Sequence, residues 1–192
     1  MEDYSKKLSI IIPVHERNYV FRVVEYYQNF KNKFNINVYI VDSSTKKKEH
    51  NFGNLNYLYY GPHKNVEKYI DILEKIDTKY VMLVGDDDIA AIDGVMQCLN
   101  FLIANTEYSA CHGKVVKFDE KTGDILDVTY QDKHFLNFTE ENFFSKDPIS
   151  RLINYFDFNN FFMLNHSLVD RITYLDSFEK YNNELLKNFR KY

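Results

Sequence analysis

Short apolar runs alternate with helix-like segments over the first hundred residues, and this alternation limits the possible folds of the chain more than any other feature. Short runs rich in β-branched residues are typical of strands buried in a parallel sheet. Segments whose apolar residues recur every three or four positions are typical of helices that cover a sheet. We expect strands at 8–14, 38–41, 55–60 and 80–84, and helices at 19–30, 66–76 and 93–105. This order predicts an α/β fold with a mostly parallel central sheet, built from right-handed crossovers and flanked by helices.

The rest of the chain has a less regular pattern. Strand-like segments at 109–118 and 125–130 flank the turn residues Lys121 to Asp124, which predicts a hairpin. Helical spacing returns at 148–156, a strand-like run follows at 161–168, and a last helix begins near Leu175. We predict a single domain over residues 1–192, with one half over about 1–105 and a smaller half over about 106–192 that completes the sheet edge.

Composition and charge exclude several classes of protein. Apolar residues make up 45% and aromatic residues 17% of the chain, which is enough for a well-filled core. The formal charge is -4 and the longest basic run is Lys46 to Lys48, so we expect no binding of nucleic acid. Cys98 and Cys111 form no Cys-x-x-Cys pair, and no apolar run is long enough to span a membrane. We therefore expect a soluble protein of the reducing cytoplasm.

Three consecutive carboxylates, Asp86 to Asp88, follow the expected strand at 80–84. Side chains after a buried parallel strand lie at the sheet edge where α/β proteins bind their ligands. Crowded carboxylates repel one another unless a cation or solvent compensates, and a divalent cation bound together with nucleotide phosphates would do so. The alternative interpretation is a solvated acidic turn at the start of the next helix.

Two other segments are expected at the same edge of the sheet. Asp42 follows the strand at 38–41. The segment Pro13 to Arg17 covers the end of the first strand and the residues directly after it. Because parallel strands end on one side of a sheet, both segments should lie close to the acidic triplet. A carboxylate after one strand can accept hydrogen bonds from a nucleobase or ribose, while the triplet holds a metal that neutralises a diphosphate. The sequence has no glycine-rich phosphate loop, which argues against dinucleotide-binding and P-loop proteins.

The segments that converge at this edge resemble family 2 glycosyltransferases of the GT-A fold. They read Ser-Ile-Ile-Ile-Pro-Val-His-Glu-Arg at 9–17, Val-Tyr-Ile-Val-Asp-Ser-Ser at 38–44 and Tyr-Val-Met-Leu-Val-Gly-Asp-Asp-Asp-Ile at 80–89. The resemblance implies a nucleotide-sugar-binding, Rossmann-like first half and an acceptor-side second half. It also implies that residues 86–88 form an Asp-x-Asp type motif that binds ribose, diphosphate and Mn²⁺ or Mg²⁺.

The same resemblance implies a role for each candidate residue of the donor site. Pro13, His15 and Arg17 would belong to the nucleotide-binding segment, with His15 against the base, and Asp42 would bind the base edge. Asp87 and Asp88 would hold the metal, with Asp87 as the first choice, and Asp86 would face the ribose or donor sugar. The basic residue on the phosphate side is open among Arg17, Lys64 and Lys68.

The resemblance extends into the last thirty residues. The segment 165–171 resembles a short strand followed by an arginine, and Glu184, a few residues before Arg190, resembles the position of the catalytic base. The resemblance therefore implies Glu184 as the general base, with Asp176 in reserve, although the family usually has Asp at this position. A surface carboxylate that pairs with lysines at helical spacing is the alternative interpretation of Glu184.

Together these features predict a metal-dependent glycosyltransferase. It would move a sugar from a nucleotide-diphosphate sugar, a UDP-sugar above all, to a polysaccharide or glycolipid acceptor, with inversion and a carboxylate base. A nucleotide-sugar-binding or scaffold module without turnover is the alternative, and a nucleotidyltransferase is a weaker one. The aromatic and basic residues of the last helix could also bring the protein to the inner face of a membrane as a peripheral contact, with core packing as the competing use.

Overall fold

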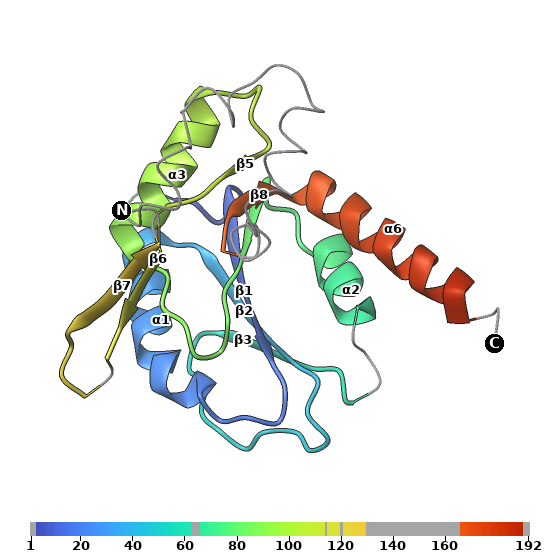
Figure 1. The fold of residues 1–192 in the computed structure, drawn as a ribbon, viewed down its shortest axis with the longest axis horizontal. Helices are drawn as coiled ribbons and strands as arrows, with labels where there is room; N and C mark the ends of the chain where they lie inside the picture. Colours follow the sequence, from blue (N-terminus) through green and yellow to red (C-terminus); the bar gives the residue numbers. More distant parts are fainter. Residues whose placement is uncertain (1–2, 63–65, 114, 120, 130–165, 190–192) are drawn as a thin grey trace. The chain divides into compact units, whose positions relative to one another are not determined.

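The computed structural model describes residues 3–62, 66–113, 115–119, 121–129 and 166–189, and Figure 1 shows its elements. The chain divides into two compact units, Met1–Cys111 with His166–Tyr192, and His112–Asn165. The C-terminal helix thus belongs to the same unit as the first hundred residues. The prediction of one domain in two halves stays a prediction, as does the acceptor-side role of the second half.

A six-stranded sheet runs through the first unit in the order β3-β2-β1-β4-β8-β5. The first four strands along the chain are parallel, and β8 and β5 continue the sheet in antiparallel pairing. The strands are β1 (Leu8–Val14), β2 (Asn37–Asp42), β3 (Asn56–Tyr59), β4 (Tyr80–Leu83), β5 (Ala110–Cys111) and β8 (Leu168–Asp170). This confirms the predicted fold class as far as an α/β fold with a mostly parallel central sheet flanked by helices.

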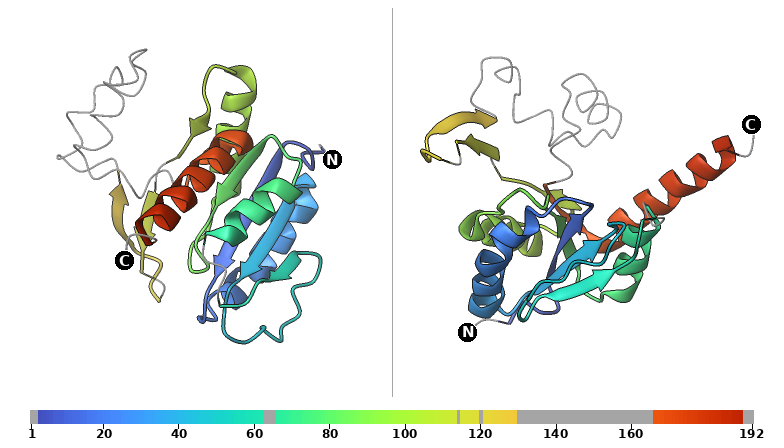
Figure 2. Two further views of the ribbon diagram at one scale, coloured as in Figure 1. Left: turned by 90° about the vertical axis from the view of Figure 1, so that its right-hand side faces the viewer. Right: turned by 90° about the horizontal axis from the view of Figure 1, so that it is seen from below.

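Helices cover both faces of the sheet, as Figure 2 shows. They are α1 (Val20–Phe34), α2 (Glu67–Lys75), α3 (Ile92–Ala104) and α6 (Arg171–Phe189). The alternating side chains of β1 explain the two layers, because Ile10 and Ile12 enter the core under α1 and α3, whereas Ile11 enters the core under α2 and α6. All three isoleucines are fully buried, as expected for a strand that is covered on both sides.

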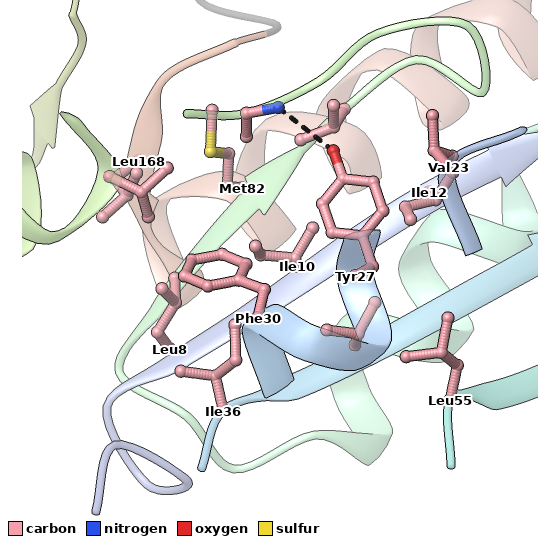
Figure 3. Packing of buried hydrophobic residues seen from close by; sticks show 14 of the residues in the cluster. Leu8, Ile10, Ile12, Val23, Tyr27, Phe30, Ile36, Leu55, Met82 and Leu168 are labelled. Atoms are coloured by element: carbon pink, nitrogen blue, oxygen red, sulfur yellow. Dashed lines mark hydrogen bonds between the residues drawn. The ribbon is translucent and has the colours of Figure 1, made fainter. Parts of the chain in front are cut away.

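The larger core also fixes the backbone of the acidic segment. Tyr27 and Phe30 of α1 are fully buried against the sheet (Figure 3). The Tyr27 hydroxyl accepts a hydrogen bond from the Ala90 amide at 3.2 Å and donates one to the Asp88 carbonyl at 3.4 Å. A helix early in the chain therefore holds the loop that follows β4.

Arg171, directly after β8, joins the elements of the opposite face. Its guanidinium donates to the Leu73 carbonyl at 2.8 Å and to the Thr78 carbonyl at 3.1 Å. The Leu73 carbonyl lies in the last turn of α2, where helix carbonyls have no partner within the helix. Arg171 therefore caps α2 and ties it to the segment that enters β4.

The second unit contains the predicted hairpin, formed by β6 (Val115–Phe118) and β7 (Ile125–Thr129) in antiparallel pairing. Its turn is held by the Asp119 carboxylate, which accepts from the Lys121 and Thr122 amides at 2.8 and 2.9 Å. The prediction of one strand over 109–118 is wrong, because β5 pairs with β8 in the large sheet and β6 pairs only with β7. The predicted helix at 148–156 and most of the strand-like run at 161–168 lie outside the described residues.

No helix in the described part of the chain combines the length and the apolar character that crossing a lipid bilayer requires.

Candidate functional site

A pocket of about 380 Å³ lies at the carboxyl end of β1. Residues from β1 and its loop, from α2 and from the loop after β4 line it: Pro13, Val14, His15, Glu16, Arg17, Lys68, Tyr69 and Asp86. The parallel register of β1 with β4 brings the ends of these strands together at one edge of the sheet. Five of the residues that the sequence proposed for the site, Pro13, His15, Arg17, Lys68 and Asp86, thus line one pocket where α/β proteins bind ligands.

The carboxylates of the triplet lie in three different environments. The Asp86 side chain is 3% exposed; its Oδ1 accepts from Arg17 Nη2 at 2.8 Å, and its Oδ2 has no hydrogen-bond partner in the described structure. Asp87 is 46% exposed and accepts from Arg17 Nη1 at 3.2 Å. Asp88 is half-exposed, with its Oδ2 3.9 Å from His166 Nε2. Asp86 is the member of the triplet that lines the pocket.

Burial raises the pKa of Asp86 above its ordinary value of 3.8. The positive charge of Arg17 acts in the opposite direction, and the neighbouring carboxylate of Asp87 raises the pKa further. A buried polar atom that has no partner is rare in native proteins and needs an explanation. Asp86 therefore brings to the pocket lining a carboxylate whose buried Oδ2 has no partner in the described structure.

Lys68 supplies a buried positive charge to the same pocket. Its residue is 5% exposed, and its Nζ donates to Ser43 Oγ at 2.7 Å. Burial lowers the pKa of Lys68, while the carboxylates of Asp42 and Asp86 act to raise it. An ammonium group has three donors, so this lysine can still bind an anion in the pocket. Among the basic candidates, Lys68 and Arg17 line the pocket, whereas Lys64 lies outside the described residues.

Asp42 is buried completely and is not one of the pocket-lining residues. Its Oδ1 accepts from the Ser44 amide at 2.8 Å and its Oδ2 accepts from the Tyr57 hydroxyl at 2.5 Å. Both oxygens therefore have protein partners, and the charge of Asp42 acts on Lys68. Direct contact of Asp42 with a nucleobase stays a prediction. It would require the hydrogen bond from Tyr57 or from Ser44 to break.

The loop after β1 is fastened to the loop after β2. Glu16 has a left-handed backbone with a φ of 54°, which is unfavourable for a residue with a side chain. Its carboxylate accepts from the Thr45 amide at 2.8 Å and the Thr45 hydroxyl at 2.5 Å, and these hydrogen bonds lower the pKa of Glu16. Its amide donates to Ser44 Oγ at 2.8 Å. These hydrogen bonds hold the strained turn in place and so fix the backbone position from which the Arg17 side chain extends.

His15 has one ring nitrogen committed to the protein. Nδ1 lies 3.0 Å from the Ser43 carbonyl oxygen, which can only accept, so Nδ1 carries the hydrogen of this bond. In the neutral ring Nε2 is then an acceptor, and His15 lines the pocket. His15 can thus accept a hydrogen bond from an N–H or O–H group of a ligand.

Tyr69 is a pocket residue that the sequence did not single out, whereas Glu16 belongs to the predicted segment Pro13 to Arg17 but had no role of its own there. Tyr69 lies in α2, where its helical spacing indicated only a core position, and its ring stacks on Phe178 of α6 with centroids 5.0 Å apart. The C-terminal helix therefore supports one wall of the pocket. Asp176 is exposed on this helix, while Glu184 lies within α6 but its side chain is outside the described structure.

A divalent cation at the triplet would need ligands from a bound molecule in addition to the carboxylates. No group of three or more His, Cys, Asp or Glu side chains suited to a metal occurs among the described residues. Mg²⁺ is commonly bound through one or two carboxylates and the phosphates of a substrate. Asp86, with its unpartnered Oδ2, and the adjacent Asp87 meet that requirement.

No protein-family model matches the chain, and no curated protein matches it. Solved structures that it resembles include S. aureus TarS, at 19% identity and a TM-score of 0.41, with 62% of this chain and 22% of that chain covered. A second is S. aureus TarS 1-349, at 18% identity and a TM-score of 0.39, with 62% and 37% covered. The chain thus spans about a fifth to two fifths of the length of these structures. The site is therefore described from the residues of this chain.

Proposed function

We propose that this chain binds a nucleotide-diphosphate sugar and acts as a glycosyltransferase domain. The observation that carries the proposal is that one pocket is lined by both a buried cation, Lys68, and a buried carboxylate, Asp86. The ammonium group suits phosphate oxygens, and the unpartnered Asp86 Oδ2 suits a sugar hydroxyl or a cation. A nucleotide-diphosphate sugar carries phosphates next to hydroxyl groups and satisfies both. The resemblance of segments 9–17, 38–44 and 80–89 to family 2 glycosyltransferases supports the same ligand class.

The nucleotide end of the donor is assigned to His15 and the neighbouring loop. The acceptor nitrogen of His15 suits an N–H group of a base, and the uracil of a UDP-sugar has one. Asp42 would accept a hydrogen bond from the edge of the base once its hydrogen bond with Tyr57 or Ser44 is broken. The donor sugar would lie on the Asp86 side of the pocket.

The proposed reaction is a direct displacement with inversion. The acceptor hydroxyl attacks the anomeric carbon, the diphosphate leaves, and Glu184 takes the proton of the hydroxyl. Mn²⁺ or Mg²⁺, held by Asp86 to Asp88 with the donor phosphates, would stabilise the negative charge of the leaving group. Lys68 adds positive charge on the other side of the same phosphates. The acceptor is proposed to be a saccharide or a lipid-linked saccharide, which would bring the protein to the inner face of a membrane.

The donor site is tested by titrating UDP into the protein in a calorimeter, with and without Mn²⁺. We expect tighter binding with Mn²⁺, loss of this metal dependence in Asp87→Ala, and binding weakened at least about tenfold in Lys68→Met, because a charge-assisted hydrogen bond is removed. Lys75→Met is the matched control on the same helix, since Lys75 is 63% exposed and pairs with Asp71. Absence of nucleotide binding to the native protein, or equal binding by the two methionine variants, would contradict the assignment.

An assay of turnover distinguishes an enzyme from a binding or scaffold module. Hydrolysis of UDP-sugars by the native protein should exceed the uncatalysed rate and should be lost in Glu184→Gln while UDP still binds. Equal background rates for the two proteins would favour a module without turnover.

A further inference from the structure

Arg17 occupies the space between two carboxylates of the triplet. Its Nη2 lies 2.8 Å from Asp86 Oδ1 and its Nη1 lies 3.2 Å from Asp87 Oδ2. One guanidinium thus bridges a buried acid and a half-exposed acid that are adjacent in the chain. The bridge supplies the positive charge that the crowded acids need when the pocket holds no ligand.

A divalent cation at this site would require the same two carboxylates. The acids proposed to hold Mn²⁺ or Mg²⁺ include Asp86 and Asp87, and one oxygen of each is hydrogen-bonded to Arg17. A cation between these carboxylates and a guanidinium in the same place would repel each other at short range. The two cations therefore compete for the acids.

The Arg17 side chain is able to leave while its backbone stays. The side chain is 55% exposed, and its guanidinium lies 5.1 Å from the Tyr19 ring, so it is not enclosed by the core. The loop at its base is held by the hydrogen bonds of Glu16 to Ser44 and Thr45. A guanidinium also matches phosphate oxygens with two parallel donors. Phosphates that enter the pocket would offer Arg17 a new partner next to the old one.

We propose that Arg17 is a displaceable counter-ion that couples metal binding to nucleotide binding. Without a bound nucleotide it neutralises Asp86 and Asp87 and opposes binding of a divalent cation. When a nucleoside diphosphate binds, the guanidinium moves to the phosphates and the two acids become available to the cation. This inference rests on the proposed nucleotide-sugar site and assigns Arg17 a positioning role within it.

The coupling has a measurable consequence in each binding reaction. The affinity for Mn²⁺ alone is held down in the native protein, because the cation must displace two ion pairs. UDP should raise the affinity for Mn²⁺, and by linkage Mn²⁺ should raise the affinity for UDP by the same factor. Removing the guanidinium should strengthen Mn²⁺ binding without nucleotide and reduce this factor.

The test measures Mn²⁺ binding by the electron paramagnetic resonance signal of the free ion, with and without UDP. The proteins are the native chain, Arg17→Gln, Arg17→Lys and the control Arg22→Gln. Arg22 lies over the same Tyr19 ring, at 5.2 Å, but does not line the pocket, so its removal changes the net charge equally. Thermal unfolding of each variant verifies that it folds.

We expect Arg17→Gln to bind Mn²⁺ alone about three- to tenfold more tightly than the native protein, in line with the strength of exposed ion pairs. UDP should enhance its Mn²⁺ binding less than it does in the native protein. Arg17→Lys has a single ammonium that cannot bridge the acids with two parallel donors, so its Mn²⁺ affinity and its enhancement by UDP should lie between those of the native protein and Arg17→Gln. Arg22→Gln should match the native protein in both.

Mn²⁺ binding to Arg17→Gln that is no tighter than native, while UDP still binds both proteins, would overturn the counter-ion role and leave the donor site standing. An unchanged enhancement by UDP would overturn the coupling in the same way. If the native protein binds neither Mn²⁺ nor UDP, the donor site and the coupling both fail.

Discussion

Replacement of Asp86 by Asn should make the folded protein more stable at neutral pH. Asp86 is 3% exposed, and one oxygen of its charged group has no hydrogen-bond partner in the described structure. Asn has nearly the same shape, keeps an oxygen that can accept from Arg17, and places a neutral group where the charge was. Functional residues are often kept at such a cost to stability.

The size of the effect follows from two opposing contributions. A buried polar group without a partner costs about 1–3 kcal/mol, and the amide of Asn would keep part of that cost. The ion pair with the half-exposed Arg17 is worth about 0.2–1 kcal/mol, and Asn would lose part of it. We therefore expect a net gain of about 1 kcal/mol in the free energy of unfolding. For a chain of this length that corresponds to a rise of about 2–4 °C in Tm.

The gain should depend on pH in a defined direction. Because burial raises the pKa of Asp86 above 3.8, the folded protein keeps a proton on this group in a pH range where the unfolded chain has released it. The stability of the native protein therefore falls as the pH rises through that range. Asn cannot titrate and escapes this loss. The advantage of the variant should be smaller at about pH 4 than at about pH 7.5.

Urea unfolding followed by circular dichroism at both pH values measures the effect. Asp87→Asn is the control, because Asp87 is 46% exposed and its replacement should change stability by less than about 0.5 kcal/mol. If Asp86→Asn is less stable than native at about pH 7.5, or if its advantage is equal at the two pH values, the argument from the buried charge is wrong.

Two further substitutions test how the site is supported. Tyr27→Phe removes the hydroxyl that accepts from the Ala90 amide, so it should cost about 1–3 kcal/mol in urea unfolding; a change below about 0.5 kcal/mol would show that this amide does not depend on Tyr27. Arg171→Ala removes the donors to the Leu73 and Thr78 carbonyls and should also cost about 1–3 kcal/mol, with faster hydrogen exchange at the end of α2. Unchanged exchange there would contradict the capping role.

The strands and helices of the first hundred residues were predictable because their signals are local. The apolar run at 8–14 coincides with β1. Ile10, Ile11 and Ile12 alternate between two cores because successive side chains of a strand point to opposite faces. The segment 109–118 was not predictable in the same way. It reads as one strand, but its two ends pair with different partners, β8 and β7, and pairing across the chain leaves no local pattern.

The meeting of Pro13 to Arg17 with Asp86 at one edge was predictable, because parallel strands with crossover helices must end on the same side of a sheet. The burial of Lys68 was not, since a lysine on a helix is ordinarily exposed and only the packing of α2 places it inward.

The order of elements and the cluster of acids at the ends of the strands follow from local patterns in the chain. The environment of each acid depends on the packing of the folded protein. Three identical carboxylates in a row have the same local signal, yet their environments differ. Asp86 is buried against Arg17 and has one oxygen without a partner among the described residues, Asp87 shares that arginine at the surface, and Asp88 faces His166. Such differences arise from burial and from partners distant in the chain, and these exist only after the strands have come together.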